Sequence, residues 1–239
     1  MSRNFILYTI LILSLSATQC RKGQAPYAAS TPIVYNNIDS PKTFLALGDS
    51  YTIGQSVTLT ERFPAQTTAL LRSAGINITD PKYIAATGWT TDILTSAINN
   101  QQPLGTFSVV SLLIGVNDQY QRHDTTGYRQ RFRNLLNTSI ILAGNKPDHV
   151  FVLSIPDYSV TPFAANYDTA AIRVQIDQFN DINRIETSQA SCHYLYITNS
   201  TREALTDPSL LASDGLHPSG KEYAKWSALL APMMKNVLR

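Results

Sequence analysis

The sequence has little charge and few cysteines, and both shortages exclude classes of protein. Only 15% of its 239 residues are charged, and the net charge is +2 without any cluster of Lys and Arg. Because phosphate binding normally requires clustered basic side chains, we expect no nucleic-acid partner. Two cysteines are too few for a disulfide-rich scaffold. There is no low-complexity tract and no internal repeat, so we expect one main domain and a monomer.

Long hydrophobic runs are also missing, with one exception near the N-terminus. Residues 5–15 are apolar apart from Tyr8, Thr9 and Ser14, and Arg3 precedes them. The run is too short for a transmembrane helix but has the length of the apolar part of a signal peptide. We therefore predict a signal peptide over residues 1–19 and export from a bacterial cell. A buried N-terminal helix is the alternative.

Cys20 follows this run at the position of the lipidated cysteine of bacterial lipoproteins. Residues 17–19 fit the lipidation signal poorly, since a small residue is expected directly before the cysteine. Ordinary cleavage after Ser16 is the alternative, and it would leave a periplasmic or secreted protein. We predict that Cys20 is lipidated and anchors the protein to a membrane. Cys192 would then have no disulfide partner, and we expect it to be a buried apolar residue.

The rest of the chain divides into a tether and one folded domain. Residues 20–42 are rich in proline and small polar residues, which is typical of a flexible tether. Residues 43–239 alternate short β-rich runs with helical segments, and Ser219 with Glu222 predicts a capping box at the last helix. We predict strands at 43–47, 83–86, 107–114, 150–155 and 194–198, and helices at 62–73, 90–99, 128–143, after 168 and from 219. This alternation predicts an α/β fold of three layers, α/β/α, around a five-stranded parallel sheet of flavodoxin-like order.

The first predicted strand runs directly into a glycine and presents a serine. Gly48-Asp49-Ser50 follows an apolar run, and the carboxyl ends of parallel strands are where ligands of such sheets bind. A nucleophilic serine requires this exposure, with backbone N–H groups nearby to receive an oxyanion. Taken alone, the motif is equally explained by a helix cap or a phosphate-binding loop.

A candidate base for this serine lies near the C-terminus, within residues 213–218. Asp214 and His217 are three residues apart in a turn, close enough for direct contact. A serine nucleophile requires a base to take its proton, and the base requires a carboxylate to fix its tautomer. A capping residue beside a surface histidine, or two metal ligands, are the alternatives. A metal site would need a third ligand, and because no further cluster of His or carboxylates is present, we expect no metal.

Two further motifs follow the second and third predicted strands. Gly88 allows close approach of the backbone to a ligand, and Asn117 offers a side-chain amide. A tetrahedral intermediate needs two or three such donors around its oxygen. Each motif alone is also explained by ordinary turn chemistry, because Gly and Asn favour loops.

Together and in this order, the four motifs resemble those of the SGNH hydrolases, also called GDSL esterases and lipases. The resemblance covers residues 43–238 and implies the SGNH hydrolase fold and an ester hydrolase without a metal or organic cofactor. It also implies a role for each motif residue: Ser50 as nucleophile and oxyanion donor, Gly88 and Asn117 as further oxyanion donors, His217 as general base and Asp214 as the carboxylate that orients it. Serine attack would proceed through an acyl-enzyme.

Aromatic residues around these motifs are candidates for binding the substrate. Tyr51, Trp89, Tyr120 and Tyr158 lie in predicted strand-end loops, where they are expected to contact the substrate or, alternatively, to anchor loops on the core. Tyr51 stands where the family name implies leucine, so it bears on substrate fit. We expect a small-molecule or carbohydrate ester with a short acyl group, such as an O-acetylated sugar.

Two other functions compete with this one. A lipase or lysophospholipase would be favoured by a long apolar lid, and no such insertion separates the motifs. A non-catalytic surface-binding lipoprotein on a hydrolase scaffold would be expected to have lost a catalytic residue, and none is lost.

Overall fold

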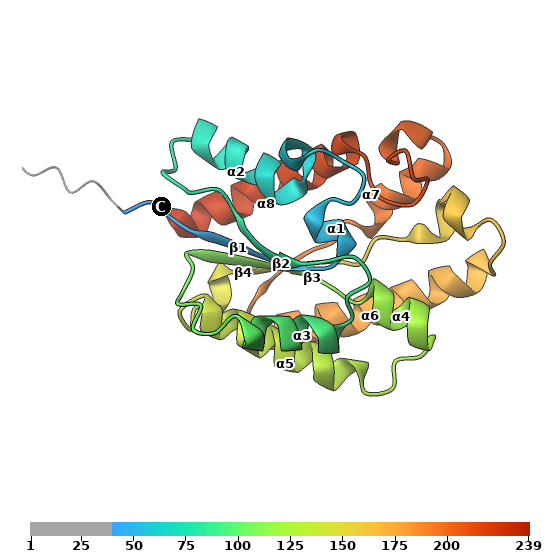
Figure 1. Cartoon of the computed structure of the whole chain (residues 1–239), viewed down its shortest axis with the longest axis horizontal. Helices are drawn as coiled ribbons and strands as arrows, with labels where there is room; N and C mark the ends of the chain where they lie inside the picture. The colour runs from blue at the N-terminus through green and yellow to red at the C-terminus, as the bar shows by residue number, and fades with distance from the viewer. Residues whose placement is uncertain (1–39) are drawn as a thin grey trace, which may run out of the picture. The chain divides into compact units, whose positions relative to one another are not determined.

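A parallel sheet forms the middle layer of the computed structural model, which describes residues 40–239 (Figure 1). The predicted signal peptide, Cys20 and all but the last three residues of the predicted tether lie outside the described residues. The strands are β1 (Phe44–Gly48), β2 (Lys82–Ala85), β3 (Val109–Leu113), β4 (Val150–Leu153) and β5 (His193–Leu195). They pair in parallel in the order β2-β1-β3-β4-β5. The predicted α/β fold with a five-stranded, flavodoxin-like sheet is therefore confirmed.

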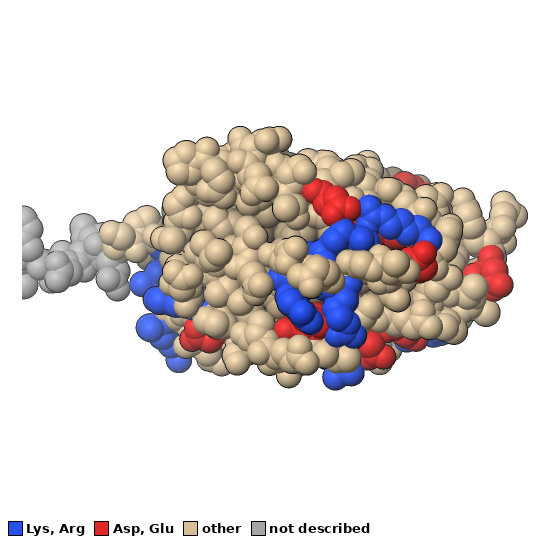
Figure 2. All heavy atoms as spheres, turned by 90° about the horizontal axis from the view of Figure 1, so that it is seen from below, with Lys and Arg blue, Asp and Glu red and all other residues tan. Residues whose placement is uncertain are grey.

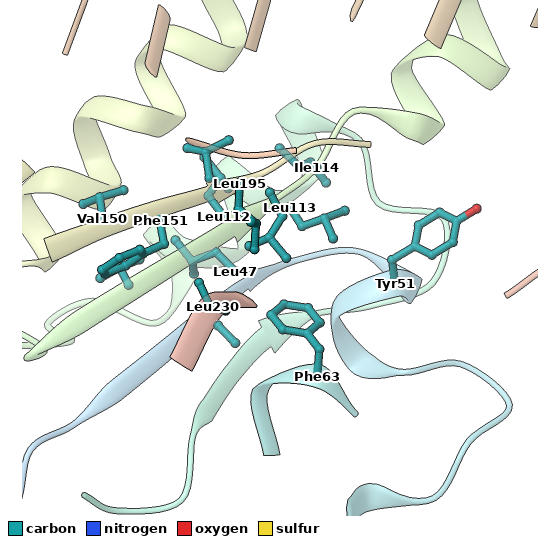
Figure 3. Packing of buried hydrophobic residues seen from close by; sticks show 14 of the residues in the cluster. Leu47, Tyr51, Phe63, Leu112, Leu113, Ile114, Val150, Phe151, Leu195 and Leu230 are labelled. Carbon is teal, nitrogen blue, oxygen red and sulfur yellow. The ribbon is translucent and has the colours of Figure 1, made fainter. Parts of the chain in front are cut away.

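Helices cover both faces of this sheet, which explains why the central strands are apolar on both sides (Figure 1). One face carries α2 (Phe63–Ser73) and α8 (Gly220–Leu238), and the other carries α3 (Thr91–Asn100), α5 (Tyr128–Leu142) and α6 (Thr169–Gln189). Figure 3 shows the packing at the sheet, where Leu47, Leu112 and Phe151 belong to the same buried cluster as Leu230 of α8.

Short helices occupy places where the sequence predicts loops. They are α1 (Ser50–Ile53), α4 (Val116–Arg122) and α7 (Thr198–Arg202), with 3-10 turns at Leu59–Glu61, Pro147–His149, Tyr158–Val160, Pro162–Ala164, Glu203–Leu205 and Pro208–Leu210. The expectation of a loop at Asn117 was wrong, because this residue lies in the first turn of α4. Helices of one or two turns are too short to show a hydrophobic period.

The predicted strand ends also differ from the observed ones. The apolar runs at 107–114 and 150–155 extend beyond the hydrogen-bonded strands β3 and β4, since burial continues where strand pairing stops. The predicted strand at 194–198 ends at Leu195, and α7 begins at Thr198. The alternation of elements thus came from the sequence pattern, whereas their exact ends depend on neighbouring strands.

The capping box predicted for the last helix is only half formed. Ser219 Oγ accepts a hydrogen bond from Glu222 N over 3.4 Å. The Glu222 carboxylate instead accepts from Ser200 Oγ at 2.6 Å and from Trp226 Nε1 at 2.8 Å. Burial decides this choice, because the indole N–H and the carboxylate both need partners inside the protein.

Cys192 packs against the core but is only partly buried, and its thiol is free. Burial raises the pKa of this thiol to about 12. The side chain is therefore a neutral thiol at physiological pH, which makes it a poor nucleophile.

Charged side chains of both signs are interspersed on the face seen in Figure 2. Arg122 pairs with Asp92 at 2.7 Å and with Asp118 at 2.9 Å. Arg133 and Arg129 both pair with the buried carboxylate of Glu186. These arginines are engaged by acidic partners, so their charge is locally neutralised.

Candidate active site

The sequence presents Ser50 through a tight turn between β1 and α1. Asp49 caps α1, with its Oδ1 accepting a hydrogen bond from Tyr51 N at 3.0 Å. A Cβ at Gly48 would overlap the Thr52 side chain and the Leu113 carbonyl oxygen, so this position has room only for glycine. The close approach of the backbone here places Ser50 directly at the carboxyl end of β1.

The structure brings Ser50, His217 and Asp214 into one hydrogen-bonded chain. His217 Nε2 lies 2.9 Å from Ser50 Oγ, and His217 Nδ1 lies 2.7 Å from Asp214 Oδ2. Ser50 and His217 are separated by 167 residues in the sequence and are both buried. This arrangement has the geometry of a nucleophile, a base and an orienting carboxylate.

The carboxylate of Asp214 is held at both of its oxygens. Oδ1 accepts from the backbone N–H groups of Leu216 and His217, each at 2.9 Å. Oδ2 accepts from Ser56 Oγ at 2.6 Å as well as from His217. Burial raises the pKa of Asp214, but these hydrogen bonds outweigh it and lower the pKa to about 2. Asp214 is therefore ionised at physiological pH.

Ser56 helps to hold the Asp214 carboxylate, and the sequence did not reveal this contact. It lies 158 residues before Asp214, in a turn after α1, and its backbone has a positive φ of 65°. This conformation is uncommon for a residue other than glycine. No local motif signals the contact, because it depends on how the turn after α1 packs against the Asp214 loop.

The loop of residues 86–90, at the end of β2, is fastened to its neighbours by polar side chains. Asn117 Nδ2 donates to Trp89 O at 3.1 Å, and Gln121 Nε2 donates to Gly88 O at 3.3 Å. Gly88 has a positive φ of 80° that favours glycine. An amide carries two N–H bonds, so Asn117 retains a second donor after binding Trp89.

These residues surround a cavity of about 140 Å³ at the carboxyl ends of the strands. Its lining is Ser50, Tyr51, Thr87, Gly88, Val116, Asn117, Tyr120, Tyr158, Phe163, Leu216 and His217. Ser50 and His217, the predicted nucleophile and base, thus line the same space as Gly88 and Asn117, the other two predicted oxyanion donors. Thr87, Val116 and Leu216 were not singled out from the sequence, because they are ordinary side chains within or beside the motifs.

Three of the four aromatics predicted to contact the substrate line this cavity, and one does not. Tyr51, Tyr120 and Tyr158 are in its wall, and the Tyr51 ring lies 5.3 Å from the His217 ring. Figure 3 shows the Tyr51 ring at the edge of the buried cluster, pointing away from the other labelled side chains. The placement of Trp89 was wrong: its ring packs against the core, and its carbonyl oxygen holds Asn117. Position at a strand end does not determine which way a side chain points.

Asp49, the neighbour of the nucleophile, is a buried acid. Burial raises its pKa to about 8, and the nearby negative charge of Asp118 acts in the same direction. Its Oδ2 has no hydrogen-bond partner among the described residues. At neutral pH the protonated form predominates, so Asp49 adds little negative charge beside Ser50.

Two of the other three histidines have side-chain contacts within the fold, and His123 caps the end of α4 through its backbone. His149 Nδ1 lies 2.6 Å from Ser108 O, and the His193 ring stacks on Phe151 with centroids 4.8 Å apart. Among residues 40–239, no group of three His, Cys, Asp or Glu side chains is placed to hold a metal ion. Within the same residues, no helix is both long and apolar enough to cross a membrane.

Comparison with known proteins places the chain in one family. The GDSL-like lipase/acylhydrolase family matches residues 46–225, but no curated protein matches the chain. A solved acetylxylan esterase from Geobacillus stearothermophilus is similar at 18% identity and a TM-score of 0.61, over 83% of this chain and 94% of that one. A lipase/acylhydrolase from Enterococcus faecalis is similar at 17% identity and a TM-score of 0.62, over 82% and 96% of the two chains.

The family match covers most of the domain and includes all four motifs. It confirms the resemblance that the motifs suggested, and it agrees with the sheet order and with the cavity around Ser50. The chain belongs to the GDSL-like lipase/acylhydrolase family, the SGNH hydrolases, and is a serine ester hydrolase.

Proposed function

We propose that the protein hydrolyses short-chain carboxylic esters through an acyl-enzyme on Ser50. His217 Nε2 takes the proton from Ser50 Oγ as the oxygen attacks the ester carbonyl, and His217 then protonates the departing alcohol. A water molecule then hydrolyses the acyl-enzyme. His217 takes a proton from this water, the resulting hydroxide attacks the acyl carbonyl, and the acid leaves as His217 returns the proton to Ser50. Asp214 keeps the imidazole in the tautomer that can act as base and stabilises the imidazolium.

The negative charge of each tetrahedral intermediate requires donors on the opposite side of the carbonyl carbon. We assign this role to the backbone N–H groups of Ser50 and Gly88 and to the side-chain amide of Asn117, because all three residues line the cavity. Donors that are already in place when the charge develops need no reorganisation during the reaction. The bond to Trp89 O holds the Asn117 amide in position.

The cavity supports a short acyl group and a carbohydrate as the alcohol part. A space of about 140 Å³ is small beside the roughly 300–1,000 Å³ of typical ligand pockets, so it suits an acetyl-sized group. A structural neighbour is an acetylxylan esterase. Another is a lipase/acylhydrolase, and a lipase or lysophospholipase would need room for a long acyl chain.

The observation that carries this proposal is the continuous chain from Ser50 through His217 to Asp214, with separations of 2.9 and 2.7 Å. We expect Ser50→Ala to abolish hydrolysis of p-nitrophenyl acetate while the circular dichroism spectrum stays unchanged. A serine-directed organophosphonate should label the wild type at Ser50 and leave this variant unlabelled. Ser73→Ala, which alters an exposed serine of α2, should behave like the wild type.

Other results would decide against the proposal. Full activity in Ser50→Ala, or labelling at a different residue, would exclude Ser50 as nucleophile. Absence of any esterase activity in the wild type would favour the non-catalytic binding protein. Rates that rise with acyl length across p-nitrophenyl esters would favour the lipase.

We also propose that Cys20 is lipidated and anchors the exported enzyme to a membrane. The support is the sequence alone, in which Cys20 follows the apolar run of the predicted signal peptide. The mature protein should partition into detergent and incorporate labelled palmitate, and Cys20→Ser should do neither. A mature protein that retains an unmodified Cys20, or that begins at residue 17, would show ordinary signal cleavage instead.

A further inference from the structure

A group of aromatic rings extends from the catalytic cavity onto the protein surface. Tyr120, in α4, lies 6.0 Å from Phe163 and 6.3 Å from Tyr167 between ring centroids. Phe163 and Tyr167 stack on each other with centroids 5.7 Å apart and planes 19° from parallel. We call Tyr120, Phe163 and Tyr167 the aromatic platform. Tyr158 lies beneath it, 6.3 Å from Tyr120 and 6.2 Å from Phe163.

The three rings of the platform are far more exposed than aromatic side chains that belong to the core. Tyr120 is 36% exposed, Phe163 40% and Tyr167 47%, whereas Tyr158 is 3% exposed. Only one other aromatic side chain among residues 40–239 reaches this exposure, Tyr196 at 44%. Contiguous exposed apolar groups of this kind commonly mark ligand-binding surfaces.

The platform is fastened to the catalytic machinery. Tyr120 and Phe163 line the cavity that contains Ser50, whereas Tyr167 is not among its lining residues. Phe163 N donates to Gly215 O at 3.2 Å, which ties the platform to the loop that carries Asp214 and His217. The hydroxyls of Tyr120 and Tyr167 hydrogen-bond to each other at 3.2 Å. The three rings therefore form one surface that continues outward from the reacting centre.

We propose that the aromatic platform is a subsite for the alcohol part of the substrate and that this part is a chain of pyranose sugars. The inference rests on the proposed ester hydrolysis at Ser50. With the acyl group in the small cavity, the alcohol part extends towards solvent, and Tyr120 and Phe163 are the lining residues whose rings are exposed there. Tyr167 lies about 6 Å beyond Tyr120 and Phe163, measured between ring centroids. A ligand that contacts all three rings is therefore longer than one sugar.

The exposure and chemistry of the platform favour a sugar over an acyl chain. An acyl chain gains stability by removing its whole surface from water, which requires an enclosed groove. A pyranose ring needs only one covered face: its axial C–H groups pack on an aromatic ring while its hydroxyls remain in water or bond to polar neighbours. Tyr120 and Tyr167 supply phenol hydroxyls at this surface, and tyrosine combines an apolar ring with such a polar group.

The experiment compares two substrates in four proteins: wild type, Tyr167→Ala, Tyr167→Phe and Tyr196→Ala. The measured quantity is the ratio of kcat/KM for chemically acetylated xylotetraose to kcat/KM for p-nitrophenyl acetate. Tyr167→Ala should lower this ratio about five- to tenfold, the effect expected for one lost aromatic contact. Tyr167→Phe retains the ring and should lower it only about two- to threefold, the effect of one weak hydrogen bond. Tyr196→Ala removes an equally exposed ring elsewhere and should leave it unchanged.

Substrate length and binding without turnover provide two further readouts. The effect of Tyr167→Ala should be smaller for an acetylated xylose monomer than for the tetramer, because the monomer is too short to reach Tyr167. In a Ser50→Ala background, which binds without hydrolysis, Tyr167→Ala should weaken calorimetric binding of acetylated xylotetraose by the same factor.

The outcomes separate the platform from the esterase mechanism. An active wild type whose ratio is unaffected by Tyr167→Ala, or which does not hydrolyse acetylated sugars, would overturn the platform while leaving the esterase intact. A selective loss on long-chain p-nitrophenyl esters in Tyr167→Ala would make the platform an acyl site and would equally overturn it. Failure of the wild type to hydrolyse p-nitrophenyl acetate would refute the proposed function itself.

Discussion

The hydroxyl of Ser56 donates a 2.6 Å hydrogen bond to Asp214 Oδ2, the same oxygen that receives His217 Nδ1 at 2.7 Å. A residue outside the three proposed catalytic groups therefore shares the oxygen that orients the base. Because two backbone N–H groups fix the other oxygen, the Ser56 bond completes the restraint of this carboxylate.

We predict that Ser56→Ala lowers kcat about tenfold with little change in KM, because a hydrogen bond to a charged group is removed. Ser56→Gly also removes the hydroxyl but relaxes the positive φ of 65° at this position. Steady-state kinetics should therefore show the same loss in both variants. If Ser56→Gly kept wild-type activity while Ser56→Ala did not, backbone strain rather than the hydroxyl would be responsible.

Asp214→Asn should reduce kcat by about 10²–10⁴-fold, and His217→Ala should reduce it further. The two backbone donors at Oδ1 require an acceptor, so the new amide N–H₂ would face His217 Nδ1. That places a donor against the nitrogen that must carry the proton, which favours the wrong tautomer. Equal inactivity of the two variants would contradict this order, and activity that depends on added zinc would identify the pair as metal ligands.

Asn117→Ala should lower kcat by about 10²–10³ with little change in KM, because the amide is proposed to bind the oxyanion only as charge develops. Asn117 also donates a hydrogen bond to Trp89 O, so its removal could lower kcat by loosening the loop of residues 86–90. A control variant has to separate this effect from loss of the oxyanion donor. Gln121→Ala removes a different tether of the same loop, the bond to Gly88 O. We expect it to change kcat by less than about threefold, since Gln121 itself does not line the cavity. An Asn117→Ala effect confined to KM would indicate a ground-state contact.

The raised pKa of Asp49 predicts a pH-dependent stability. In the unfolded chain this carboxyl ionises near 3.8, whereas in the folded protein its pKa is about 8. Between these values the folded state holds a proton that the unfolded state has lost, so this group makes the free energy of unfolding decrease as pH rises. Asp49→Asn keeps an oxygen for Tyr51 N and removes the ionisation.

Urea denaturation of both proteins at pH 5 and pH 8 tests this prediction. The stability of Asp49→Asn relative to the wild type should rise by a few kcal/mol between the two conditions, as expected for a shift of this direction and size. A difference that stays constant, or that falls with pH, would show that Asp49 is ionised in the folded protein throughout this range.

The sequence alone was sufficient for the class of fold and for the residues of the motifs. Apolar runs that alternate with helical periods predict a parallel sheet covered on both faces, and the five strands pair in the predicted order. Ser50, Gly88 and Asn117 were placed together because the carboxyl ends of parallel strands meet at one edge, and His217 was added to them through the resemblance to the SGNH hydrolases. These inferences use local backbone preferences and chain order, which a linear sequence contains.

Only the tertiary structure decided which side chains share the site. Trp89 is partly buried against the core, whereas Phe163 lines the cavity, although both lie in strand-end segments. Ser56 meets Asp214 across 158 residues, and Tyr120 meets Tyr167 across 47. The direction of a side chain and its distant partners depend on how packed helices and turns fill space around it. This packing, which no local pattern encodes, holds Asp214 from both sides and extends the cavity onto the aromatic platform.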